Sequence, residues 1–225
     1  SAGATGQTFN FGTTLNNADV VTGGAGTADV VTATTAAVTD LDGVTAVETI
    51  RLGAASAGGI TLGAGAFLAD TTRVTVDATA VTAGQVYTLA AANRGLTVNL
   101  NVGNAAIDNV VVNTTVANVS NAHAVSGLGA LDTLDFTINA TQAHSVTIGS
   151  FNAATFAGDV NAALATLVGY VASATGAVIV NVTGSADRYV VVGDLTAGGG
   201  LVSAADEVVK IVGANTLLID GTSLI

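Results

Sequence analysis

The sequence predicts a mainly β protein, in which a parallel β-solenoid-like or β-sandwich N-terminal part is followed by a C-terminal helix packed on a small sheet. Half of the 225 residues are apolar but only 4% are aromatic, so small and β-branched side chains that suit closely stacked strands must build the core. Short runs of alternating apolar and polar residues also recur roughly every 10 to 14 residues. A single stretch near the C-terminus has helical spacing instead.

The alternating runs predict strands in the first 150 residues, separated by turns rich in Gly, Asn and Asp. The clearest runs are 8–11, 47–52, 73–76, 85–89 and 96–100. A solenoid is favoured over a sandwich because Thr and Asn recur at outward positions, where stacked ladders would pair their side chains. These positions are Thr75, Thr97, Asn99, Thr137 and Asn139. A sandwich remains the alternative, although its inner faces normally carry more large aromatic residues.

Residues 151–225 read differently and form the second predicted domain, a cap on the β-rich assembly domain 1–150. After a possible cap at Asn152, apolar residues fall on one helical face up to Gly176, where a helix commonly stops. The apolar residues are Phe156, Val160, Leu164, Leu167, Val168 and Val171. Strands are then expected at 177–182, 188–192, 207–212 and 216–219. Such a cap would cover an open end of the solenoid.

The charge balance excludes one class of partner. Sixteen acidic residues against five basic ones give a net charge of -11, which repels nucleic acid and anionic lipid. Solubility and divalent-cation binding both account for this acidity. The stretch 160–186 has no charged residue and raises a membrane-span alternative. We expect no membrane insertion, because the stretch contains polar residues and becomes strand-like at Gly176.

The residues that carry catalysis are scarce, and we predict that the chain is not an enzyme. It has no Cys, its only histidines are His123 and His144, and its only glutamates are Glu48 and Glu207. The histidines lack the spacing of a metal site, so each is expected to be a surface or strand polar residue. No nucleophile elbow, phosphate-binding loop or dinucleotide fingerprint is present in the sequence.

A glycine and aspartate motif points to calcium. The pattern G-x-G-x-x-D, followed by apolar residues, occurs at Gly24–Asp29 and at Gly127–Asp132, and it is a looser form of the nonapeptide that binds calcium in parallel β-coils. We therefore expect bound Ca²⁺, with ligands from clustered Asp and Asn side chains. The candidate ligands are Asn17, Asp19 and Asp29, then Asp40 with Asp42, Asp132 with Asp135, and Asp194 with Asp206. For each group the alternative is an Asx turn or a strand-end cap.

Several segments resemble a known family. The run D-R-Y-V-V-V-G-D at 187–194, then A-D-E-V-V-K-I-V-G at 205–213 and the apolar tail to Ile225, are similar to the C-terminal end of type I-secreted surface-layer and repeats-in-toxin proteins. Segments 44–52, 107–111 and 125–136 are similar to further modules of that family. The strict tandem Gly-Gly-x-Gly-x-Asp array is missing from the sequence, so we expect few and irregular calcium sites.

The resemblance implies an extracellular structural protein that forms a cell-surface layer or filament. It would self-assemble with calcium, leave the cell through an uncleaved type I secretion region at 187–225, and have itself and a cell-surface polysaccharide as candidate partners. The alternative is the C-terminal portion of a secreted adhesin or extracellular hydrolase whose functional domain lies upstream. Since Ser1 is not an initiator Met and no signal segment follows it, we expect a processed form or a fragment.

The first strand is the predicted connector between subunits. Phe9 and Phe11 alternate with Asn10 in a chain that has few aromatic residues, so the run 7–11 could pair with the edge of a neighbouring molecule. The alternative is that both side chains belong to the core of the first coil.

Overall fold

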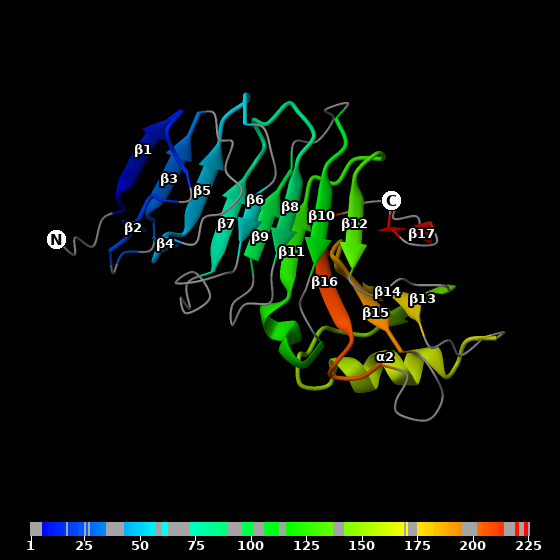
Figure 1. Ribbon diagram of the computed structural model, residues 1–225. Coiled ribbons are helices and arrows are strands. Elements are labelled where there is room, and N and C mark those ends of the chain that lie inside the picture. Colours follow the sequence, from blue (N-terminus) through cyan, green and yellow to red (C-terminus); the bar gives the residue numbers. More distant parts are fainter. Residues whose placement is uncertain are drawn as a thin grey trace.

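The computed structural model describes residues 6–16, 18–24, 26, 28–34, 43–56, 60–62, 73–89, 96–100, 106–112, 116–136, 142–168, 170, 175–194, 202–213, 219–220 and 223–224. Within them the chain is mainly β, as predicted, and winds into stacked coils (Figure 1). One wall of the coils is a row of parallel strands. They are β1 (Thr8–Gly12), β3 (Val30–Ala33), β5 (Thr49–Leu52), β7 (Val74–Asp77), β9 (Leu96–Asn99) and β11 (His123–Ser126).

The opposite wall holds the strand that follows in each coil. Its parallel strands are β6 (Ile60–Leu62), β8 (Val86–Leu89), β10 (Asn109–Val112) and β12 (Thr133–Phe136), and β2 (Val21–Thr22) pairs separately with β4 (Val44–Thr45). Beyond β12 this sheet ends in the short antiparallel pair β17 (Ile219–Asp220) and β18 (Ser223–Leu224). Of the strand expected at 216–219, only residue 219 lies within the described ranges.

The parallel register between successive coils is that of a solenoid, the favoured of the two predicted architectures. One coil takes between 19 residues, where Val30 pairs with Thr49, and 27 residues, where Thr97 pairs with Ala124. The spacing of roughly 10 to 14 residues between the predicted runs is therefore the spacing of single strands, because each coil contributes two strands.

Inward-facing residues stack in registered rows that form the core. One row joins all six strands of the first wall, and every member after Phe9 is completely buried: Phe9, Val31, Ile50, Val76, Val98 and Val125. Such rows bury apolar surface between coils although each side chain is small. Phe9 and Phe11 are half-buried against this core, as expected of residues in a terminal coil.

The polar rows predicted on the outer face are present where the structure describes them. Thr75 pairs with Thr97, and the Ser126 hydroxyl donates to the Asn99 side-chain oxygen at 2.7 Å. Arg51 and Asp77, neighbours in the same face, form an ion pair at 3.2 Å. Thr137 and Asn139 lie outside the described residues.

The first wall continues past β11 into the C-terminal part and becomes a ten-stranded sheet. The added strands are, in order, β16 (Glu207–Val212), β15 (Arg188–Gly193), β14 (Gly176–Val182) and β13 (Gln142–Ile148). Only β15 runs against the others. The predicted domain boundary at residue 150 falls between β13 and its partner strand β14.

Helix α2 (Phe156–Leu164) packs on the C-terminal end of the sheet (Figure 1). Phe156, Val160 and Leu164 are buried on one face of the helix. They form a second apolar cluster with residues of the sheet, including Val180 and Tyr189. None of the helices that the structure describes has the length and apolarity of a membrane span.

The helix is shorter than its sequence pattern predicts. It begins after Thr155, while Asn152 instead forms an Asx turn by accepting the Ala154 N–H at 3.0 Å. It ends at Leu164, because turn contacts follow, among them the Thr166 hydroxyl donating to the Ala163 carbonyl at 2.7 Å.

The residues expected in the missing part of the helix have other positions. Val168 is fully exposed, whereas Leu167 still packs on the cluster, and Val171 lies outside the described residues. Gly176 opens β14 rather than stopping the helix. Apolar spacing alone therefore placed the end of the helix too late.

Replacing Gly158 with alanine should raise the free energy of unfolding by about 1 kcal/mol, the usual difference between the two residues inside a helix. Gly158 is an exposed residue of α2, and an added Cβ would meet no atom within 4 Å. Urea denaturation followed by circular dichroism measures the change. Gly193→Ala is the matched control and should destabilise the protein, since its Cβ would collide with the Asp206 carboxylate. A destabilised G158A would contradict the helix assignment.

Candidate functional site

Carboxylates occupy the corners where the chain enters a strand. At the corner before β10 the Asp108 Oδ1 atom accepts the N–H of Gln85 at 2.9 Å, and at the corner before β12 the Asp132 Oδ1 atom accepts the N–H of Asp108 at 2.9 Å. Asp132 also accepts the Gly129 N–H at 2.7 Å through Oδ2. The side chains of Gln85, Asp108 and Asp132, which follow one another from coil to coil, are all buried. Asp132 therefore binds both the preceding coil and its own turn.

The corner before β3 repeats this arrangement. The Asp29 Oδ1 atom accepts the Gln7 N–H at 2.6 Å, and its Oδ2 atom accepts the Gly24 N–H at 2.6 Å. In turn the Asp29 N–H donates to the Glu48 Oε2 atom at 2.7 Å. His123 does the same between β9 and β11, where its buried Nδ1 atom accepts the Leu96 N–H at 3.0 Å. His123 is thus a buried strand residue and not a surface one.

The two G-x-G-x-x-D motifs therefore bend the chain so that their aspartates meet backbone N–H groups. In the first motif the donor to the aspartate is Gly24, and in the second it is Gly129. Gly127 has a φ of 77°, a left-handed conformation that glycine adopts without strain. Hydrogen bonds between a carboxylate and N–H groups are worth about 1.5–3 kcal/mol each, so these corners hold successive coils in register.

Tyr87 lies near the corner residues Asp108 and Asp132. It is completely buried on the inner side of β8, and its hydroxyl bonds to none of the described residues. Burial, followed by the charges of Asp108 and Asp132, raises the pKa of Tyr87 well above its ordinary value. The hydroxyl therefore stays protonated in the core.

Asp194 and Asp206 are the predicted pair that the structure brings together. They flank the turn between β15 and β16, where the Asp206 Oδ1 atom accepts the Asp194 N–H at 3.3 Å and its Oδ2 atom accepts the Ser203 N–H at 2.7 Å. Burial raises the pKa of Asp206, and the charge of Asp194 adds to the increase. Asn161 of α2 holds the same turn, since its Oδ1 atom accepts the Val202 N–H at 2.6 Å. A cation between the two carboxylates would offset their repulsion.

The other predicted ligands do not converge. Asp19 is half-buried and accepts the Asn16 N–H of its own turn at 2.7 Å, whereas Asp29 serves the buried corner. Asp132 is buried, while Asp135 occupies an outward, half-buried position of β12. Asn17, Asp40 and Asp42 lie outside the described residues. Within the described ranges, no three His, Asp or Glu side chains form a group that could hold a metal ion.

Two corner residues, Glu48 and Asp108, were absent from the predicted set. The sequence does contain a signal for these two residues. An acidic residue lies one or two positions before a run of β-branched residues in each case: Asp29-Val-Val, Glu48-Thr-Ile and Asp108-Asn-Val. At such a position the side chain reaches the N–H of the coil before it. An acidic residue directly before a strand therefore identifies the corner carboxylates better than glycine spacing does.

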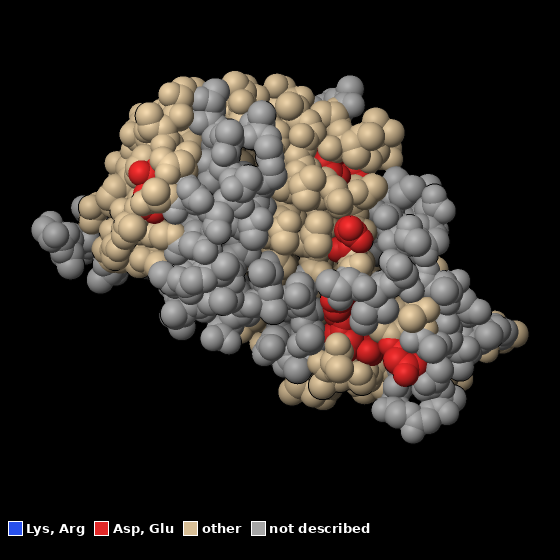
Figure 2. All heavy atoms as spheres, viewed as in Figure 1, with Lys and Arg blue, Asp and Glu red and all other residues tan. Residues whose placement is uncertain are grey.

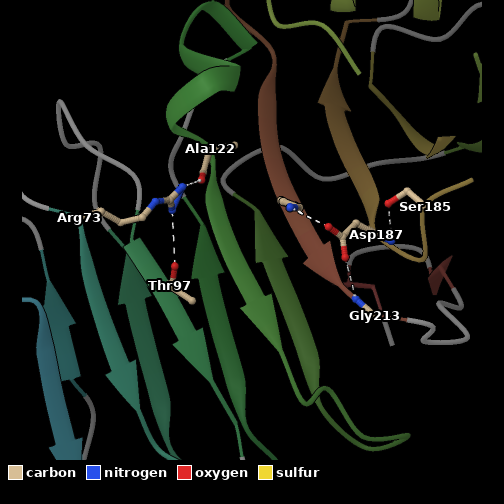
Figure 3. Close-up of polar contacts among 7 residues, drawn as sticks. Arg73, Thr97, Ala122, Ser185, Asp187 and Gly213 are labelled. Atoms are coloured by element: carbon tan, nitrogen blue, oxygen red, sulfur yellow. Dashed lines mark hydrogen bonds and ion pairs between the residues drawn. The ribbon is translucent and has the colours of Figure 1, made fainter. Parts of the chain in front are cut away.

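Further polar contacts lie within the solenoid and, separately, within the C-terminal strands (Figure 3). Arg73 reaches from the start of β7 to the Ala122 carbonyl at 3.0 Å, next to the end of the 3₁₀ helix η1 (Val116–Asn121). Asp187 forms an ion pair with Lys210 at 2.7 Å and accepts the Gly213 N–H at 3.1 Å. The hydrogen bond from Lys210 is the main cause that lowers the pKa of Asp187. These contacts are structural.

The charge on the described surface agrees with the acidic composition of the chain. Figure 2 shows acidic side chains in separate places on one face of the molecule, and no basic side chain among the described residues of that face. Nothing on the described part of this face would attract a phosphate backbone. Comparisons with protein-family models, with curated proteins and with solved structures gave no match.

Proposed function

We propose that this chain is a self-assembling structural protein of the cell exterior, forming a layer or filament with calcium and leaving the cell by a type I route. The observation that carries the proposal is the sheet edge at β1, which pairs on one side only among the described strands, so that stacking of coils can continue from one molecule to the next. A solenoid interacts mainly through its ends, because each coil contacts only its neighbours. The acidic charge and the C-terminal resemblance agree with this role.

Calcium enters the proposal through Asp194 and Asp206. Their shared turn joins the C-terminal sheet to α2 through Asn161, so an ion held there would stabilise the cap. Calcium prefers six to eight oxygen ligands, of which the two carboxylates would supply a part and water the remainder. Binding only to the folded state adds stability by mass action.

We expect chelation of calcium to lower the melting temperature of the protein and to disperse its polymer. The measurements are differential scanning calorimetry and electron microscopy of the purified chain in millimolar calcium or chelator. The double variant Asp194→Asn with Asp206→Asn should lose the response to calcium. Asp159→Asn is the matched control, because Asp159 is exposed on α2, remote in sequence from the turn. Identical melting curves and identical particles in both buffers would refute the role of calcium.

A further inference from the structure

The edge strand β1 lacks charge and proline, two features that normally block edge pairing, although its register with β3 shifts between Asn10 and Gly12. It lies at one end of the ten-stranded sheet (Figure 1), and among the described strands only β3 pairs with it. Its sequence Thr-Phe-Asn-Phe-Gly has no charged residue, and the chain has no proline. Sheet edges are usually protected by charge, proline or a covering element.

The backbone of β1 has hydrogen-bonding groups directed away from β3. The Gln7 carbonyl accepts the Val30 N–H at 2.7 Å on the β3 side. Because successive residues of a strand direct their N–H and C=O groups to opposite sides, those of Thr8 and Asn10 point to the open side. A strand added there would pair with Asn10 at its centre.

The side chains of β1 favour a partner with the same sequence. Phe9 and Phe11 are half-buried on the core side, while Thr8 and Asn10 are exposed on the other face. In an antiparallel pair centred on Asn10, Phe9 of one molecule lies opposite Phe11 of the second. The four phenylalanines would then form one apolar cluster across the joined cores, with aromatic pairs that add about 0.5–1.5 kcal/mol each.

The other edge of the same sheet is a poorer partner. Following the registered rows from Val125 through β16, β15 and β14 leads to Thr147 on β13. The face of β13 that continues the Phe9 row therefore presents Ser145 and Thr147, both exposed and polar. Pairing of β13 with β1 would place these polar groups beside the phenylalanines, whereas self-pairing of β1 buries apolar surface on both sides.

Charge also favours contact at this end. Between Ser1 and Gly24 the sequence contains one charged residue, Asp19, although the whole chain carries a net charge of -11. Repulsion between two acidic molecules is therefore weakest where their first coils meet.

We infer that two copies of this chain associate about a two-fold axis through antiparallel pairing of their β1 strands, with Asn10 opposite its own counterpart. The inference rests on the proposed self-assembly and specifies one of its contacts. An isologous contact of this kind is the commonest in homo-oligomers. Polymer growth then requires a second contact elsewhere on the molecule.

A single cysteine tests the geometry, because the chain has none of its own. In Asn10→Cys the two cysteines would occupy a hydrogen-bonded antiparallel pair, about 5.5 Å apart between Cα atoms, within the range of a disulfide, about 4.4–6.8 Å. We expect mild oxidation to convert this variant into a covalent dimer. Ser145→Cys, exposed on β13, is the matched control and should stay monomeric on a non-reducing gel.

A second variant measures the contact without cross-linking. Asn10→Lys places a charge at the centre of the pair and should weaken the dimer at least about tenfold by analytical ultracentrifugation. The control Asn152→Lys changes an exposed residue outside β1 and should leave the dimer intact. Circular dichroism verifies that both variants fold.

Three results would overturn the inference. One is a wild-type chain that sediments as a monomer at all concentrations. Another is cross-linking between Asn10→Cys and Ser145→Cys molecules when Asn10→Cys alone does not cross-link, which would show head-to-tail contact. The third is a calcium-dependent polymer that persists in Asn10→Lys, which would reject the β1 contact and leave the proposed function standing.

Discussion

Replacing Asp29 with alanine should lower the free energy of unfolding by about 2–4 kcal/mol, because two partly buried N–H groups would lose their acceptor. These groups belong to Gln7 and Gly24, each 2.6 Å from a carboxylate oxygen of Asp29. The loss should be the same in calcium and in chelator, since the bonds from Gln7 and Gly24 form without an ion. Urea denaturation in the two buffers measures it.

Asp19→Ala is the control for Asp29. Its carboxylate accepts solvent-exposed hydrogen bonds within its own turn, so we expect a loss below about 1 kcal/mol. If the loss in Asp29→Ala were large in calcium and small in chelator, Asp29 would be a calcium ligand and the corner bonds would be secondary.

Replacing Phe156 with alanine should cost about 3–5 kcal/mol, the usual range for a buried phenylalanine. Phe156 is completely buried under α2, with its ring 5.3 Å from Tyr189 and 5.8 Å from Phe151 between centroids. The resulting cavity lies between the helix and the sheet, so the cap loses its main apolar anchor. Thermal unfolding monitored by near-ultraviolet circular dichroism reports the change.

Phe151→Ala provides the comparison for Phe156. Phe151 is 38% exposed and stacks on Tyr189 at 4.8 Å, so removing it should cost about 1 kcal/mol. Equal losses in the two variants would show that α2 is not anchored by Phe156.

The strands were predictable because alternation is preserved where one face of a strand is buried. Runs such as 96–100 and 188–192 match β9 and β15 closely. The end of α2 was not predictable from apolar spacing, since Val168 continues the helical pattern but is exposed after a turn at Thr166. The order of strands in the sheet could not be predicted from the sequence either, because pairing between distant segments leaves no local sequence pattern.

The candidate site was predicted in part. The sequence pointed to Asp29 and Asp132 through their glycines, and the structure gives both a defined position at a coil corner. The alternative of an Asx turn or a strand-end cap anticipated N–H partners within each motif, but not the second donor, which belongs to the preceding coil. Asp108 was overlooked for the same reason: its partner, Gln85, lies 23 residues earlier.

The placement of β16 beside β11 has a consequence for how the chain folds. His123 pairs with Val209, 86 positions further along, whereas the earlier coils pair with segments made shortly before them. Coils can therefore form one after another as the chain emerges from the ribosome, but the edge of β11 waits for the C-terminal part of the chain. Closing so long a loop costs more entropy and slows folding. Until it closes, the exposed edge of β11 is the point at which newly made chains are most prone to aggregate.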